Sequence, residues 1–224
     1  MKKPDQKKAD WAAAVIVLAV GVPILALGGM AFASGEQARR EVPVRGLVGQ
    51  QAYSQWQGWC EGDPRPEQHY VRPSVVPERR PGCEHPRYRA PDFTLPTRDG
   101  GQWTLSEHRG KVIVINFWTT TCAPCMEEMP SLLELARILE DRDDIELITI
   151  SVDRDWETVN SAVSPDEPLT VLLDPEREVV NGSFGTRLFP ETWVIDGEGV
   201  IRLRVDGQRS WSSALALDAF ETYL

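Results

Sequence analysis

Histidine and cysteine are scarce in this sequence, with three histidines and four cysteines in 224 residues. Cys122 and Cys125 form a Cys-x-x-Cys pair, and no second such pair or spaced pair of histidines accompanies it. A structural zinc site normally takes four such ligands, so the composition argues against zinc. Basic residues are also few, because 24 Lys and Arg face 34 Asp and Glu for a net charge of -10. This balance argues against nucleic-acid partners, since phosphate contacts need clustered lysines and arginines.

One long hydrophobic run is present, near the N-terminus. Residues 1–10 are basic, and residues 11–33 carry no charge. At ~1.5 Å per residue, a helix over the second segment spans roughly 34 Å, enough to cross a bilayer core of ~30 Å. We therefore expect a cytoplasmic tail, a single-pass signal-anchor helix in the cell inner membrane, and a C-terminal domain in the periplasm. The alternative is a soluble exported protein, because "AFA" resembles a signal-peptide cleavage site ending at Ala33.

The segment 34–89 is rich in proline and glycine and lacks hydrophobic periodicity, which predicts an extracytoplasmic linker. It contains Cys60 and Cys83, and export places them where disulfides persist. We predict that they pair, because a disulfide that closes a loop of this size stabilises by roughly 3–4 kcal/mol. A copper site with His69 and His85, a relay with the other cysteine pair, and free thiols are the alternatives.

A globular α/β domain is predicted over 90–224. The segments "FTL" and "QWTL" predict an N-terminal β-hairpin. The run "KVIVINFW" (111–118) is apolar and β-branched, which is typical of a strand buried on both faces of a parallel sheet. Apolar residues then recur at helical spacing from about 122 to 141, with Pro130 expected to kink that helix. Further strands are expected at 145–153, 169–174, 192–196 and 200–207, and helices at 155–163, 175–184 and 210–224. Such alternation indicates a mixed sheet flanked by helices.

The Cys-x-x-Cys pair lies where the predicted strand passes into the predicted helix. Unpaired N–H groups and the dipole at a helix N-terminus favour an anion, so the pKa of a thiol there falls from ~8.5 towards ~7. Cys122 is therefore the predicted nucleophile, and Cys125, one turn further on, is the predicted resolving cysteine. Pro124 in the first turn costs nothing and stiffens the ring. A purely structural disulfide across so short a loop would stabilise little.

Four segments in combination resemble the TlpA/ResA-like family of exported, membrane-anchored thiol–disulfide oxidoreductases of the redoxin superfamily. They are "APDFTL", "GKVIVINFW", "CAPCMEEMP" and "FPETWVID". The resemblance covers roughly 90–224 and implies a thioredoxin-like fold without a cofactor. It also implies that Glu128 transfers protons to or from Cys125, although Glu128 as a solvent-facing helix residue is the alternative. Pro190 matches the family's cis-proline, which exposes the backbone of Phe189 to a client.

The resemblance implies a reductant of protein clients with disulfides, such as apocytochrome c or copper-site assembly proteins, and hence a part in cytochrome c-type biogenesis. A membrane electron-donor protein would recharge the dithiol. Thr121 and Ala123 depart from the family's usual Trp and Gly or Glu, at positions that shape potential and partner choice. A thioredoxin-fold copper chaperone and a peroxiredoxin-like thiol peroxidase are the alternatives. Thr119 fits a peroxidase motif, but Ile115 stands where that motif has proline.

The remaining candidates are assigned to structure rather than to chemistry. We expect His108 to be a surface loop residue. We expect Trp103, Trp193 and Trp211 to be core residues rather than ligand-stacking ones.

Overall fold

The structure is a computed structural model that describes residues 39, 42–44, 46–47, 77–80 and 83–224. The predicted tail and signal-anchor helix, and also Cys60, lie outside these residues. Within the described part of the chain, no helix is long and apolar enough to cross a membrane. The chain divides into two compact units, 1–42 and 43–224, and the second unit contains the sheet and its helices.

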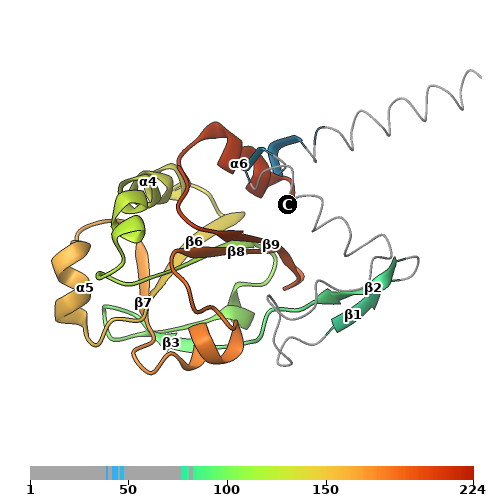
Figure 1. Cartoon of the computed structure of the whole chain (residues 1–224). Helices are drawn as coiled ribbons and strands as arrows, with labels where there is room; N and C mark the ends of the chain where they lie inside the picture. The colour runs from blue at the N-terminus through green and yellow to red at the C-terminus, as the bar shows by residue number, and fades with distance from the viewer. Residues whose placement is uncertain (1–38, 40–41, 45, 48–76, 81–82) are drawn as a thin grey trace, which may run out of the picture. The chain divides into compact units, whose positions relative to one another are not determined.

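A five-stranded mixed sheet forms the centre of the second unit (Figure 1). Its strands are β5 (Val112–Trp118), β6 (Ile145–Ser151), β7 (Thr170–Leu173), β8 (Glu191–Ile195) and β9 (Ile201–Asp206), in the order β7-β6-β5-β8-β9. The first three strands run parallel, while β8 is antiparallel to both β5 and β9. Every residue of β5 is buried, which confirms the strand predicted from its unbroken apolar run.

Within residues 83–224, the α-helices that accompany the sheet are α4 (Ala123–Leu139), α5 (Trp156–Ala162) and α6 (Ala214–Glu221). All three match predicted helices, and α4 contains Pro130. The remaining predicted helix, over 175–184, is instead a π-helical turn, η3 (Glu178–Ser183). The carboxylate of Asp174 accepts the backbone N–H groups of the first three residues of η3, so it holds this turn against the end of β7.

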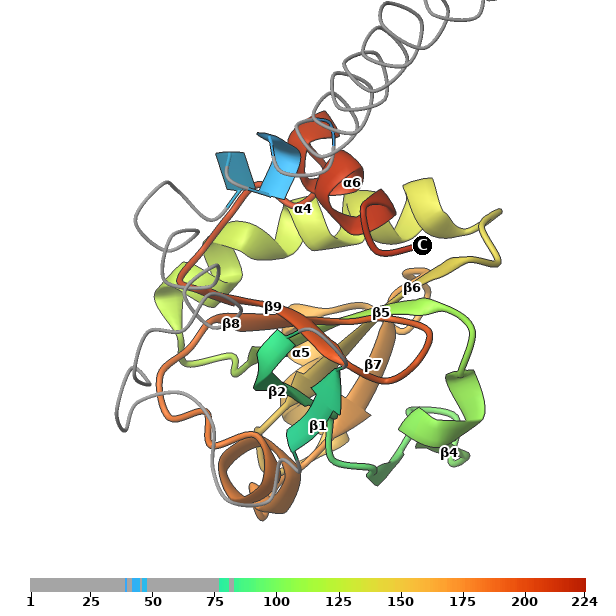
Figure 2. The same cartoon turned by 90° about the vertical axis from the view of Figure 1, so that its right-hand side faces the viewer.

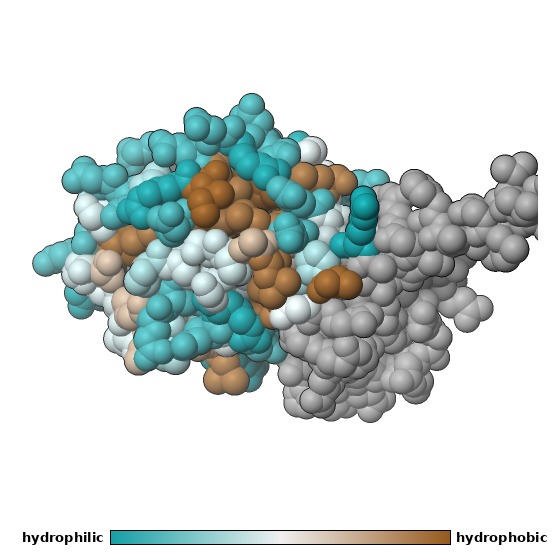
Figure 3. Space-filling model, turned by 90° about the horizontal axis from the view of Figure 1, so that it is seen from above, coloured by the Kyte–Doolittle hydropathy of each residue, from teal (hydrophilic) through white to brown (hydrophobic). Residues whose placement is uncertain are grey.

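The two faces of the sheet carry separate hydrophobic cores. Alternate residues of β5 face opposite ways: Val112 and Val114 belong to one core, and Ile113, Ile115 and Phe117 to the other. The first core includes residues of α4 and α6, which lie together on one side of the sheet (Figure 2). Seen from above Figure 1, the surface is mostly hydrophilic, with hydrophobic residues gathered in a band (Figure 3).

The second core is covered by η3 and by an antiparallel pair of short strands, β3 (Thr94–Pro96) and β4 (Gln102–Thr104). Trp103 and Trp193 lie in this core, and Trp211 lies in the first. All three indole side chains are buried, which confirms that they are core residues.

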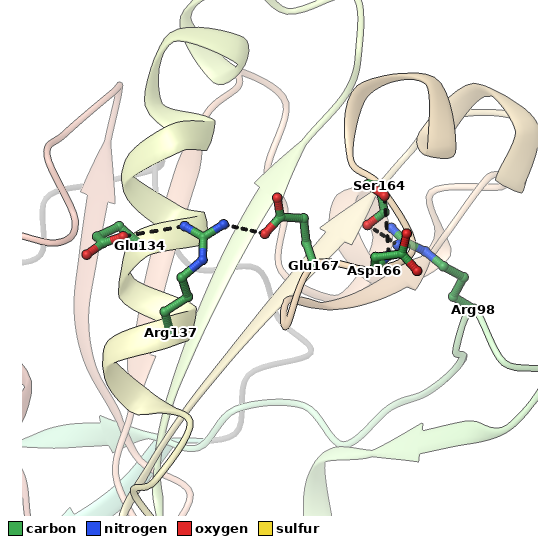
Figure 4. Close-up of polar contacts among 6 residues, drawn as sticks. All are labelled: Arg98, Glu134, Arg137, Ser164, Asp166 and Glu167. Carbon is green, nitrogen blue, oxygen red and sulfur yellow. Dashed lines mark hydrogen bonds and ion pairs between the residues drawn. The ribbon is translucent and has the colours of Figure 1, made fainter.

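Polar contacts tie α4 and the β3–β4 turn to the loop between α5 and β7 (Figure 4). Arg137 of α4 forms ion pairs with Glu134 on its own helix and with Glu167 in that loop. Arg98 of the turn donates to the carbonyl oxygen of Ser164 in the same loop, at 2.9 Å. Arg137 lies in the last turn of α4, so its ion pair with Glu167 holds the helix at the end opposite to the cysteine pair.

Parts of the predicted linker take part in the second unit. Val44 and Leu47 are helical and buried in the first core, although they precede the predicted domain by more than forty residues. A Cβ atom added at Gly46 would lie 2.8 Å from the Leu215 side chain, so this turn lies close against α6. Further on, β1 (Pro77–Arg80) pairs antiparallel with β2 (Cys83–Tyr88). Because Cys60 lies outside the described residues, its pairing with Cys83 stays a prediction.

Candidate functional site

The cysteine pair lies at the N-terminus of α4, directly after β5. Cys122 is the N-cap residue, with an extended backbone (φ -91, ψ 103), and Cys125 is in the first turn. The two sulfurs form a disulfide whose Cα atoms are 5.2 Å apart. Cys122 Sγ also accepts the backbone N–H of Cys125 at 3.2 Å. Cys122 is half-buried whereas Cys125 is fully buried, so Cys122 is the more accessible sulfur of the pair.

The other residues of the motif surround the exposed side of this pair. Thr121, Ala123 and Pro124 are all exposed. Pro124 stands in the first turn of α4, where its missing N–H has no intrahelical partner to lose. These three residues are therefore accessible to solvent next to Cys122.

Pro190 lies at the same edge of the sheet as the dithiol. Phe117 of β5 is paired with Glu191 of β8, so the residue before Glu191 lies level with the end of β5, where the chain turns towards Cys122. The Phe189–Pro190 peptide bond is cis. Pro190 itself is buried, Phe189 is half-buried, and the Leu188 side chain is 83% exposed. The loop thus presents an apolar residue to solvent at the edge of the sheet where the dithiol lies.

Glu128 is a buried carboxyl group one turn beyond Cys125. Its side chain is only 3% exposed, so the alternative of a solvent-facing residue is wrong. One carboxyl oxygen accepts from Asn116 Nδ2 at 2.8 Å, and the other accepts from Trp211 Nε1 at 2.9 Å and from the Arg209 backbone N–H at 3.0 Å. Burial raises the pKa of Glu128, and the hydrogen bonds to its ionised form offset part of that rise.

Asn116 connects this carboxyl group to the strand that follows Pro190. Its Nδ2 atom donates to Thr192 Oγ1 at 2.9 Å as well as to Glu128. Its Oδ1 atom is buried and has no hydrogen-bond partner among the described residues. A buried polar network therefore joins α4, β5 and β8 beneath the disulfide.

An open hollow of about 540 Å³ lies beside Glu128. Its lining comes from α4 and from the segment after β9, and consists of Glu127, Glu128, Pro130, Ser131, Gln208, Arg209 and Ser210. The hollow brings solvent to the edge of a carboxyl group that is otherwise buried.

Two buried acidic residues near the site, Asp153 and Glu191, were not predicted from the sequence. Asp153, just after β6, accepts hydrogen bonds from Thr119 and Thr120 in the segment that leads to Cys122. One signal was available, since the carboxyl ends of neighbouring parallel strands lie at the same edge of a sheet. Glu191, next to Pro190, accepts from Trp193 Nε1 at 2.5 Å.

His108 lies away from the cysteine pair. It ends a short 3₁₀ helix, η2 (Leu105–His108), and is half-buried rather than a surface loop residue. Its Nδ1 atom lies 2.7 Å from Glu146 Oε2, and its ring stacks on Trp103 with centroids 4.3 Å apart. Glu146 is near the start of β6, whereas the dithiol follows the end of β5, so these contacts secure the opposite end of the sheet.

Within the part of the chain that the structure describes, no three or more His, Cys, Asp or Glu side chains are grouped so that they could hold a metal ion.

A disulfide at a helix N-terminus, a cis-proline at the same edge and a mixed five-stranded sheet define a thioredoxin-fold protein with a thiol–disulfide oxidoreductase site. The profile of the AhpC/TSA family matches residues 86–204, which is more than half of the chain. The chain therefore belongs to the AhpC/TSA family.

Named relatives agree with this class. The chain is 31% identical over 119 residues to the thiol-disulfide oxidoreductase ResA of Geobacillus thermodenitrificans, covering 53% of this chain and 67% of that protein. It is 29% identical over 114 residues to the thioredoxin-like protein YneN of Bacillus subtilis, covering 51% and 67%. A crystal structure of a thiol:disulfide interchange protein from Chlorobium tepidum superimposes with a TM-score of 0.54 at 24% identity, covers 63% of this chain and all of that one, and supports the fold. This protein is thus an enzyme of the thiol–disulfide oxidoreductase class.

Proposed function

We propose that this enzyme reduces disulfides in specific exported client proteins, with Cys122 as the nucleophile and Cys125 as the resolving cysteine. The observation that carries the proposal is the asymmetry of the pair: Cys122 is the half-buried N-cap residue of α4, while Cys125 is fully buried in the first turn. The helix N-terminus stabilises a thiolate at Cys122, which a client reaches first. The buried Cys125 then resolves the mixed disulfide that forms at Cys122.

Two thiol–disulfide exchange steps complete the reaction. The Cys122 thiolate attacks one sulfur of the client disulfide, that S–S bond breaks, and one client thiolate leaves. The Cys125 thiolate then attacks Cys122 Sγ, which forms the intramolecular disulfide and releases the second client thiolate. Two electrons pass from the enzyme to the client, and both client thiolates take up protons from solvent. A membrane electron-donor protein then returns the enzyme to its dithiol form.

Glu128 is the proposed proton acceptor for Cys125 in the second step. The two residues are three positions apart on α4 and therefore share a face of the helix. Burial raises the pKa of Glu128, which brings a carboxyl group closer to the range in which it exchanges protons at neutral pH. The hollow beside it returns the proton to solvent.

The client's backbone is proposed to lie along the loop before β8, at Phe189 and Pro190. A peptide in extended conformation would add to this loop, and its apolar side chain would cover the exposed Leu188. Thr121, Ala123 and Pro124 would contact the other side of the client's disulfide. Apocytochrome c and copper-site assembly proteins are the proposed clients, in keeping with a role in cytochrome c-type biogenesis.

The proposed location is the cell inner membrane, with residues 11–33 as a single-pass anchor and the catalytic domain in the periplasm. The uncharged length of this segment and the lysines before it support the proposal. A tether of this kind would hold the domain near its membrane electron donor.

The reduction potential of the Cys122–Cys125 couple tests this function, measured by equilibration of the purified full-length protein with glutathione and dithiothreitol buffers. We expect a value of about -250 mV or lower, together with reduction of insulin disulfides. A value of about -120 mV would reverse the proposed direction of electron flow. Tight Cu(I) binding without insulin reduction would instead identify a copper-binding module, and rapid consumption of hydrogen peroxide would identify a peroxidase.

A further inference from the structure

Asp153 is a buried carboxylate just after β6, in contact with the three-threonine segment between β5 and Cys122. We infer that Asp153 is a positioning residue, which holds this segment so that Cys122 stays at the N-cap of α4. The inference deepens the proposed function and rests on it, since it concerns how the nucleophile is kept ready.

The hydrogen bonds of Asp153 use both of its carboxylate oxygens. Oδ1 accepts from the hydroxyl groups of Thr119 at 2.7 Å and Thr120 at 2.9 Å. Oδ2 accepts from the Thr120 backbone N–H at 2.9 Å and from Ser151 Oγ at 2.8 Å. The side chain is 6% exposed, so these donors replace water almost completely. Three of the four bonds go to the segment that precedes the nucleophile.

This segment is connected directly to Cys122. The Cys122 backbone N–H donates to the Thr119 carbonyl oxygen at 3.1 Å, so the position of Thr119 sets that of the cysteine. The Thr119 hydroxyl lies 3.4 Å from that of Thr121, the last residue before Cys122. On the other strand, the Val152 N–H donates to the Trp118 carbonyl oxygen at 3.1 Å. The ends of β5 and β6 are thus joined at the point from which the nucleophile projects.

Hydrogen bonds, rather than apolar packing, must hold the three-threonine segment in place. Three successive threonines bring three hydroxyl groups and little apolar surface, and Thr121 is exposed. Hydrophobic packing therefore cannot hold the segment, whereas hydrogen bonds to a charged acceptor are stronger than those between neutral groups. Without Asp153, the buried hydroxyl of Thr119 and the Thr120 N–H would lose their acceptor, and the segment would rearrange to hydrate them.

A shift of this segment would change the stability of the Cys122 thiolate. An N-cap acceptor is stabilised only while it points at the free N–H groups of the first turn, as Cys122 Sγ points at the Cys125 N–H. If the segment shifts, the thiolate loses that donor and the apparent pKa of Cys122 rises. The negative charge of Asp153 acts in the opposite sense, because a nearby anion disfavours a thiolate. Removal of the charge alone would therefore make Cys122 more reactive, and removal of the anchor would make it less reactive.

The rate of Cys122 alkylation by iodoacetamide against pH separates these effects, measured on the reduced full-length protein with the modified cysteine assigned by mass spectrometry. D153A should lower the rate at pH 7 roughly fivefold, because a smaller fraction of Cys122 is then thiolate at that pH. D153N keeps one acceptor oxygen for the threonine hydroxyls, but its NH2 group cannot accept the Thr120 backbone N–H as Oδ2 does, so it should restore the rate only in part, to a value between those of D153A and wild type.

Asp155 provides a matched control two residues further on. It accepts from the Thr158 backbone N–H at 2.9 Å and from the Thr158 hydroxyl at 2.7 Å, as the N-cap of α5, and no hydrogen bond joins it to the threonine segment among the described residues. D155A should lower the melting temperature through the lost cap and leave Cys122 alkylation unchanged. Equal alkylation rates in D153A and D155A, or a faster rate in D153A, would overturn the inference.

A second pair of substitutions covers the case in which D153A does not fold. T119V and T120V keep the side-chain shape and remove the hydroxyl donors, so the double variant should also alkylate more slowly than wild type. Wild-type rates in the double variant would count against the positioning role. Alkylation needs no client, so these results do not depend on insulin reduction. A wild-type protein that fails to reduce insulin would refute the proposed function but not the positioning role of Asp153.

Discussion

Burial and hydrogen bonding have opposite effects on the protonation of Glu128. Burial favours its neutral form, and three hydrogen-bond donors favour its ionised form. Burial is the larger effect, so the pKa of Glu128 in the folded protein lies above the ~4.3 of an unfolded chain. The folded state therefore binds the proton more tightly than the unfolded state. The resulting contribution to stability is present below the unfolded pKa and is lost as the pH rises through the folded pKa.

E128Q should remove this pH dependence. The buried Oδ1 atom of Asn116 has no partner among the described residues, so a rotated Asn116 amide can accept from the new glutamine. The unfolding free energy of E128Q relative to wild type should therefore rise between pH 4 and pH 8, measured by urea denaturation of the oxidised proteins. E127Q, at the exposed neighbouring glutamate, is the control. A constant difference between E128Q and wild type across this range would contradict the account.

The roles of the two cysteines give a second prediction at this scale. C125S should trap a mixed disulfide between Cys122 and oxidised insulin, because the exposed thiolate still attacks but nothing resolves the adduct. C122S should trap little, since Cys125 is fully buried. Non-reducing electrophoresis followed by mass spectrometry of the adduct reads both results. Equal trapping by the two variants would mean that burial does not assign the order of attack.

At the scale of elements, the strength of the hydrophobic pattern decided what could be predicted. The unbroken apolar run predicted β5, and the helical spacing of Leu132, Ala136 and Leu139 predicted α4, because each pattern is compatible with few other structures. The segment of η3 also carries apolar residues at helical spacing, but the backbone N–H groups of Gly182 and Phe184 bond to carbonyl oxygens five residues earlier, so the turn is π-helical.

The polar parts of the site could be predicted only where a motif marked them. Cys122 and Cys125 stand in a recognisable spacing. Asp153 and Glu191 do not, since a single acidic residue at a strand end looks like any exposed one in the sequence. Their burial follows from strand order and from donors on distant segments, such as Thr119 for Asp153 and Trp193 for Glu191. Periodicity contains no information on such partners.

The packing of α4 on the sheet gives a prediction for this element. Leu132 is fully buried in the first core, whereas Ile138 on the same helix is 39% exposed. L132A should lower the free energy of unfolding by about 2–5 kcal/mol, because it removes buried methyl groups and leaves a cavity. I138A should cost less than about 1 kcal/mol. Urea denaturation of the oxidised proteins measures both, and similar losses in the two variants would argue against this packing.

At the scale of the whole molecule, the predicted division into linker and domain needs revision. The linker's composition suggested that residues before 90 form no core. Val44 and Leu47 are nevertheless buried with residues of α6, and the Leu47 carbonyl oxygen accepts from Arg209 Nε at 3.4 Å. Two apolar side chains three positions apart suffice to place one helical turn on the domain, and composition averaged over fifty residues does not reveal so short a segment.

This packing predicts that the catalytic unit extends beyond its apparent boundary. L47A should lower the free energy of unfolding by about 2 kcal/mol or more, as expected for a buried leucine. V42A should have little effect, because the Val42 side chain is 62% exposed. Thermal unfolding of the full-length proteins compares the two variants. If L47A melts at the wild-type temperature, the domain begins where the sequence alone would place it.

The central claim is that the Cys122–Cys125 pair is a working redox couple that gives its electrons to a protein disulfide. The most direct test is to mix the reduced full-length protein with excess oxidised insulin and to follow both by mass spectrometry with thiol labelling. We predict that each enzyme molecule loses two labelled thiols, both assigned to Cys122 and Cys125, as one insulin disulfide is reduced. Retention of both thiols while insulin stays oxidised would contradict the claim.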